Sequence, residues 1–94
     1  MENKFDIGTF VDSLTIPEAT SRLVERVKKC RRSLKISQQE LARRSGVSYA
    51  SVRRFEQIGE ISLTSLMKIA MALDCLEEFN KLFCMPAVTN LRDL

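Results

Sequence analysis

Hydrogen-bonding and cationic side chains are concentrated between Ile36 and Glu56, in the stretch ISQQELARRSGVSYASVRRFE. Hydroxyl, amide and guanidinium groups of this kind bind phosphate oxygens and the acceptors on base edges. Apolar residues recur among them at steps of three and four, and Gly46 interrupts the run. Because glycine tolerates the positive φ that ends a helix, the pattern predicts two short helices around a glycine turn. The second helix would present its polar and basic face outward, as in proteins that place a helix in the major groove of DNA.

The charge of the chain is unevenly distributed. The formal net charge is only +3, but the stretch from Arg22 to Arg54 holds eleven basic residues against two acidic ones, a net charge of +9. The rest of the chain, with four basic and ten acidic residues, carries −6. A basic half favours a polyanionic partner, while an acidic remainder limits nonspecific adhesion. A merely solvated basic helix is the alternative interpretation.

Length and composition exclude several classes of protein. The 94 residues allow one domain, which would bury roughly 60–65% of its unfolded surface. No apolar run approaches the ~18 residues of a membrane span, and the N-terminus lacks a signal-peptide core, so the sequence predicts a soluble, cytoplasmic protein. The three cysteines form no CxxC pair and histidine is absent. A zinc site, a disulfide framework and a cofactor are therefore not expected, and Cys30 and Cys84 are interpreted as small core residues.

The first predicted helix begins after Thr15. Thr15 and Glu18 fit a capping box, and Pro17 is tolerated in the first turn. The helix should end near Ser33. Its apolar stripe would comprise Ala19, Leu23, Val27, Cys30 and Leu34.

Three serines are predicted to be the N-caps of the next three helices. Ser37, with Glu40 three residues on, predicts a second capping box, and Gly46 ends that helix. Ser48 should cap a third helix that buries Val52 and Phe55. After a loop over residues 57–61, Ser62 should cap a fourth helix with a core-facing stripe of Leu63, Leu66, Ile69, Ala70 and Leu73.

A fifth helix should start at Asp74 or Cys75 and end before Pro86. The expected fold is thus all-α, a compact five-helix bundle with short terminal extensions. The predicted boundaries are an N-terminal arm over residues 1–14, which could be a short strand, a helical domain over 15–84, and a tail over 85–94. Apolar residues in the arm and tail exceed what a five-helix core needs.

The stretch from Leu34 to Glu56 resembles the helix-turn-helix of the Cro/phage-repressor family, also called the XRE family. The continuation SLTSLMKIAMALD resembles the fourth helix of that family, so the likeness covers about residues 20–83. It rests on the Gln38, Leu41 and Ala42 block, the Gly46-Val47-Ser48 turn, the Phe55-Glu56 pair and the Leu66–Leu73 helix. The resemblance implies a DNA-binding bundle of the phage-repressor type.

The resemblance also implies roles for single residues at the start of the third helix. Tyr49, Ala50 and Arg54 match positions that contact bases. Arg54 could donate two hydrogen bonds to guanine, worth about 1–3 kcal/mol of discrimination. Ala50 could contact a thymine methyl group, and Tyr49 a base or a phosphate.

Phosphate contacts are implied for a wider set of residues. Ser37 and Gln38 would bind a phosphate through the free amides and the positive dipole end of the second helix; Ser37 could equally be only a cap. For Arg53 and Arg54 a solvated face is the alternative. The full set of expected phosphate contacts is Lys35, Ser37, Gln38, Arg43, Arg44, Ser48, Ser51 and Arg53.

Arg31 and Glu56 match positions that form a structural ion pair in many family members. Two features depart from the family pattern. The loop after the third helix is acidic at Glu60 and one residue shorter, so its contact with the DNA backbone should be weaker. Asp74-Cys75 replaces the glycine that is common after the fourth helix.

These observations support two functional hypotheses. The first is a dimeric transcriptional repressor that reads an inverted-repeat operator, since one domain reads only a few base pairs. The second is an antitoxin that binds a toxin partner and represses the shared operon. A purely structural bundle is disfavoured by the Tyr49–Arg54 surface. An enzyme is disfavoured because the chain has no histidine, no glycine-rich phosphate loop and no clustered carboxylates.

Overall fold

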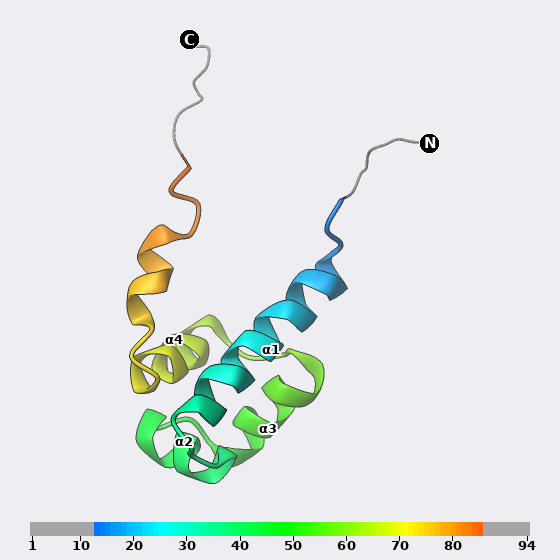
Figure 1. Ribbon diagram of the computed structural model, residues 1–94. Coiled ribbons are helices and arrows are strands. Elements are labelled where there is room, and N and C mark those ends of the chain that lie inside the picture. Colours follow the sequence, from blue (N-terminus) through cyan, green and yellow to red (C-terminus); the bar gives the residue numbers. More distant parts are fainter. Residues whose placement is uncertain (1–12, 86–94) are drawn as a thin grey trace.

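The computed structural model describes residues 13–85, which form five helical segments and contain no strand (Figure 1). The segments are the helices α1 (Ile16–Ser33), α2 (Gln38–Ser45), α3 (Tyr49–Ile58) and α4 (Leu63–Ala72), followed by the 3-10 helix η1 (Leu76–Lys81). The predicted all-α fold is confirmed. Most of the predicted arm (1–14) and tail (85–94) lies outside the described residues.

The predicted N-caps are all present. Thr15 and Glu18 form a complete capping box at the start of α1, and the hydroxyls of Ser48 and Ser62 accept the expected backbone bonds. At α2 only half of the predicted box forms, because Ser37 Oγ accepts from the Glu40 amide while the Glu40 carboxylate binds Arg43 and Arg44. Two nearby guanidinium groups compete successfully for that carboxylate.

Glycines in the left-handed conformation end both α2 and α3. Gly46 has a φ of 76° and Gly59 a φ of 77°. The Gly59 amide donates to the Phe55 carbonyl at 2.8 Å, so α3 continues to Ile58. The predicted loop over 57–61 was therefore wrong for Gln57 and Ile58, which are helical.

The core lies between α2, α3 and α4. Leu41, Val52, Phe55 and Ile69 are its most fully buried side chains, and α2 packs against both α3 and α4. α1 packs on α3 but buries only Val24 completely. The predicted stripe of α1 misses this valine. Its members Val27 and Cys30 are half-buried against the core, while Leu34 is exposed.

The C-terminal part differs most from the expectation. Leu63 was predicted to face the core but is 62% exposed. The fifth helix is a short 3-10 segment without a side-chain cap, after which Phe83 is 97% exposed. Cys84, predicted to be a core residue, is exposed. Once the chain leaves α4 it has little core to cover, so Phe83 and Cys84 stay outside.

Asp74 occupies the position where the family commonly has glycine, and its φ of 61° lies in the left-handed region. Aspartate tolerates this region better than most residues. The first part of α1 and the η1 segment then extend from one side of the body as two diverging limbs, while α2 and α3 lie at the other end (Figure 1).

Within residues 13–85 no helix combines the length and the apolar character that a membrane crossing requires. The same residues contain no cluster of histidine, cysteine, aspartate or glutamate that could hold a metal ion.

Candidate nucleic-acid interface

The outward face of α3 carries most of the residues expected to contact bases. Val52, Phe55 and Glu56 point into the protein and are buried. A helical repeat of 3.6 residues then places Ala50, Arg53, Arg54 and Gln57 on the opposite side, with Tyr49 and Ile58 at its edges. The exposed residues there are Tyr49, Ala50, Arg53, Arg54, Gln57 and Ile58.

The two arginines of α3 have different surroundings. The Arg53 guanidinium lies over the Tyr49 ring, 5.5 Å from its centroid, a cation–π arrangement that keeps the cation at the surface. Arg54 Nη2 instead donates to Glu60 Oε1 at 2.5 Å, and both side chains are 63% exposed. Arg54 is thus partly neutralised, whereas Arg53 is not paired with a carboxylate among residues 13–85.

The start of α2 presents backbone donors. The amides of Gln38 and Gln39 lie in the first turn, where no intrahelical acceptor exists. The next amide, that of Glu40, donates to Ser37 Oγ at 3.0 Å. The Gln38 side chain points inward, because its Nε2 donates to Glu56 Oε1 at 2.8 Å. The Gln38 side chain is therefore occupied, and its backbone amide is the donor that remains available.

Glu40 holds the two arginines at the end of α2. Arg43 Nε donates to Glu40 Oε1 at 3.0 Å, and Arg44 Nε donates to Glu40 Oε2 at 2.7 Å. Hydrogen bonds from Arg43 and then Arg44 lower the pKa of Glu40 to about 2. The carboxylate therefore stays ionised at neutral pH, and the three side chains together carry one net positive charge.

Lys35, Ser48 and Ser51 complete the expected phosphate-binding set. Lys35 is exposed between α1 and α2, with a φ of 59°. Ser48 Oγ accepts from the Ser51 amide at 3.1 Å and donates to Ser51 Oγ at 2.9 Å. Ser48 is exposed and Ser51 half-buried, so both stand at the start of α3 as a linked pair.

Arg31 and Glu56 join α1 to α3. Arg31 Nε donates to Glu56 Oε2 at 2.9 Å and Arg31 Nη2 to Glu56 Oε1 at 3.1 Å. The side chains are 12% and 3% exposed. Burial alone would raise the pKa of Glu56, but the hydrogen bonds from Arg31 and Gln38 and the charge of Arg31 outweigh it and lower the pKa. Glu56 is therefore a buried anion that fixes the direction of α3.

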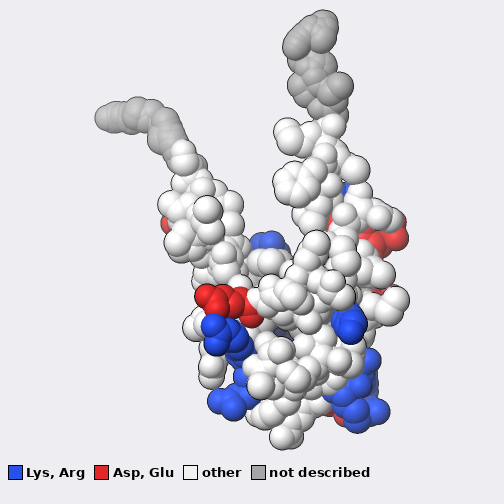
Figure 2. Space-filling model, turned by 180° about the vertical axis from the view of Figure 1, so that it is seen from behind, with Lys and Arg blue, Asp and Glu red and all other residues white. Residues whose placement is uncertain are grey.

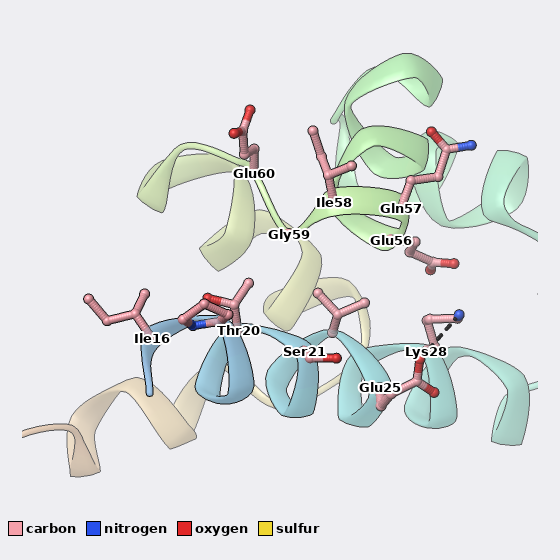
Figure 3. A pocket seen from close by; sticks show the side chains of 12 residues that line it. Ile16, Thr20, Ser21, Glu25, Lys28, Glu56, Gln57, Ile58, Gly59 and Glu60 are labelled. Carbon is pink, nitrogen blue, oxygen red and sulfur yellow. Dashed lines mark hydrogen bonds and ion pairs between the residues drawn. The ribbon is translucent and has the colours of Figure 1, made fainter. Parts of the chain in front are cut away.

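A second contact fixes the C-terminal end of α3 on α1. A Cβ at Gly59 would lie 2.3 Å from Thr20 Cγ2, so any larger residue there would displace the Thr20 side chain and would also have to adopt the positive φ of 77°. An open pocket beside this contact is lined by both helices, and Figure 3 shows Glu56 directed toward α1 and Glu60 directed away from it.

Basic groups lie on both sides of the end of the molecule that holds α2 and α3. Figure 2 shows them as separate blue groups, with uncharged surface between them and acidic groups close to the basic groups on both sides. This arrangement can attract a polyanion to the flanks while uncharged and hydrogen-bonding side chains meet its centre.

Comparison with known protein families matches residues 27–79, more than half of the chain, to a helix-turn-helix family. The chain belongs to the Cro/phage-repressor helix-turn-helix family. No curated protein and no solved structure matches it. Family membership supports sequence-specific DNA binding and transcriptional regulation, and this family comprises DNA-binding regulatory domains rather than enzymes.

Two features of this helix-turn-helix surface were missed from the sequence. Gln57 lies on the outward face of α3, one turn after Arg53, where its amide could pair with adenine. Gly59 was the available signal, because a glycine cap there extends α3 to Ile58. The pairing of Arg54 with Glu60 had no sequence signal beyond opposite charge, since the two residues are separated by a helix end.

Proposed function

We propose that this protein is a transcriptional repressor that binds double-stranded DNA sequence-specifically, as a dimer on an inverted-repeat operator. The observation that carries the proposal is the orientation of α3. Its inner face is buried and anchored through Glu56 to Arg31, while its outer face presents Tyr49, Ala50 and Arg54. A rigid helix with such a face is what base readout in the major groove requires.

In this proposal three residues of α3 contact the bases. Arg54 donates to guanine O6 and N7, Ala50 contacts a thymine methyl group, and Tyr49 contacts a base or a phosphate. The amides at the start of α2 bind one phosphate. The surrounding phosphates are bound by Lys35, Arg43, Arg44, Ser48, Ser51 and Arg53.

A dimer is supported by the outer face of α4. Leu63, Met67 and Met71 follow one another at steps of four, on the side opposite the buried Ile69 and Leu73. All three are exposed, Met71 by 66%. A helix that is apolar on both sides is normally covered on both sides. A second copy provides that cover and also brings the second recognition helix that a two-part operator needs.

Selection of bound duplexes from a random DNA pool at two salt concentrations tests the proposal. We expect enrichment of an inverted repeat whose half-site centres lie about ten base pairs apart. Binding that shows no sequence preference and disappears at the higher salt concentration would contradict it, because only the phosphate attraction would then be present.

A toxin-binding antitoxin is the second candidate. It is supported by the strongly exposed apolar side chains on the two limbs, Ile16 on one and Phe83 and Met85 on the other. Both candidates bind DNA but differ in their protein partner. Co-purification of a stoichiometric partner encoded by a neighbouring toxin gene would favour the antitoxin; a homodimer alone would favour the repressor.

A further inference from the structure

We propose that Glu60 is a specificity-determining residue that positions Arg54 for base readout. The inference rests on the proposed function, in which Arg54 contacts a base. Glu60 lies in the connection between α3 and α4, outside the recognition helix, and Arg54 Nη2 donates to its Oε1 at 2.5 Å. The pair is exposed, so DNA can reach the Arg54 guanidinium while the contact with Glu60 persists.

The position of Glu60 is fixed by the backbone next to it. Gly59 is in the left-handed conformation and lies against Thr20 of α1, whose methyl group an added Cβ would have to displace. The Gly59 amide is bonded to the Phe55 carbonyl. With the preceding residue held in this way, Glu60 leaves the chain on the side away from α1, as Figure 3 shows. That is the side on which Arg54 lies.

The geometry leaves Arg54 able to bind a base at the same time. A guanidinium group has five N–H donors in a rigid fork, and Glu60 engages one nitrogen through one oxygen. The remaining donors can form the paired bonds to guanine O6 and N7. A carboxylate behind the guanidinium reduces the number of orientations available to Arg54, and readout depends on such preorganisation.

Arg53 provides the contrast within the same helix. It lies over Tyr49, and the ion pairs of residues 13–85 do not include it. Arg53 can therefore bind phosphates of any DNA sequence, whereas the ion pair with Glu60 holds Arg54 away from the phosphates. Removal of Glu60 would make Arg54 resemble Arg53, a cation that binds phosphates without regard to sequence.

The test compares Glu60→Gln and Glu60→Ala with the parent protein on the selected operator and on duplexes altered at the Arg54-dependent base pair. We expect both variants to lose discrimination at that base pair by about twofold to fivefold, the size of an exposed ion pair. Affinity for unrelated DNA should rise, and the slope of log affinity against log salt should steepen by up to about one, because Arg54 can then displace a counterion.

Glu78→Gln is the matched control. Glu78 is an exposed carboxylate on η1 that pairs with Lys81 at 3.8 Å, so the variant removes the same charge far from Arg54. It should leave discrimination at the base pair unchanged. Thermal unfolding of the three variants checks that each is folded, as expected for exposed positions.

The outcomes separate this inference from the proposed function. If the parent selects an operator but the Glu60 variants discriminate as well as the parent, the positioning role is wrong and the repressor function stands. If the Glu78 variant loses discrimination equally, the effect is one of net charge and the positioning role is also wrong. If the parent shows no sequence preference, the proposed function and the inference fail together.

Discussion

Glu56 is the charged residue that the described fold buries most completely, and three hydrogen bonds compensate it. Both of its oxygens accept from Arg31, and one also accepts from Gln38. A buried charge without its partner destabilises the fold, and removal of one member of a buried pair lowers the free energy of unfolding by about 3–5 kcal/mol. The pair therefore makes the orientation of α3 depend on two residues that are far from the expected DNA contacts.

The lowered pKa of Glu56 predicts an acid-sensitive stability. Because the folded pKa lies below the ordinary value of 4.5, ionised Glu56 stabilises the fold fully above that value. The stabilisation is lost as the pH falls through the lower folded pKa. Denaturant unfolding between pH 2 and pH 6 measures this, with Glu56→Gln as the comparison. The variant should be less stable at pH 6 and should show a flatter dependence below pH 4.5; an equally steep curve would contradict the assignment.

Two neighbouring arginines should respond differently to removal. Arg54→Ala should relax specificity at one base pair by about 1–3 kcal/mol. Arg53→Ala should weaken binding to all duplexes alike and reduce the salt slope by about one. Affinities for a panel of single-site operator variants at two salt concentrations measure both effects. Equal behaviour of the two variants would contradict the assignment.

Gln38→Ala does not test phosphate contact alone, because it also removes the hydrogen bond from the Gln38 side chain to Glu56.

At the scale of single elements, the two left-handed glycines predict a difference in stability. Gly46→Ala should lower the free energy of unfolding by roughly 1–2 kcal/mol, the penalty of a left-handed backbone for alanine. The added Cβ would have no neighbour within 4 Å, so no steric clash adds to this penalty. Gly59→Ala should cost more, because its Cβ would also collide with Thr20. Thermal or denaturant unfolding gives the comparison.

The double variant Thr20→Ser with Gly59→Ala supplies the control for this prediction. Serine lacks the methyl group that the added Cβ would meet, so part of the extra cost should be recovered. If Gly59→Ala is no more destabilising than Gly46→Ala, the close approach of the loop to α1 does not restrict this position.

Helix existence and most helix starts could be predicted from the sequence because they depend on local groups. A serine or threonine hydroxyl that accepts an amide bond three residues on acts within one turn, as at Thr15, Ser48 and Ser62. The end of α3 was missed because Gly59, rather than the loss of apolar periodicity, sets it. The partner of Glu40 was missed because capping and ion pairing competed for one carboxylate.

Burial was less predictable because it depends on which elements meet. Leu63 fits an apolar stripe in the sequence and Cys84 was predicted to be a core residue, yet both are exposed. The resemblance to the family located the set of surface residues on α2 and α3. It could not locate the Arg54–Glu60 pair, because that contact depends on the course of the chain at Gly59.

At the scale of the whole molecule, the apolar outer face of α4 predicts self-association. Met71→Lys introduces a charge at a position that is 66% exposed, so the fold should remain while a dimer interface is disrupted. We expect a monomer in light scattering. Affinity for the full operator should fall toward that for a single half-site.

Glu77→Lys on η1 is the control for a change of charge outside the α4 face. It should leave the association state unchanged if α4 supplies the interface. A Met71→Lys variant that remains a dimer with parental affinity would place the interface elsewhere.

The two contacts between α1 and α3 also restrict how the length of this chain can change during evolution. Thr20 and Arg31, which meet Gly59 and Glu56, are eleven residues apart, about three helical turns, so both point to the same side of α1. One inserted or deleted residue between them would rotate one contact by about 100° and shift it by about 1.5 Å. Natural relatives should therefore vary between Thr20 and Arg31 by substitution of outward-facing residues, and should gain or lose residues outside this segment.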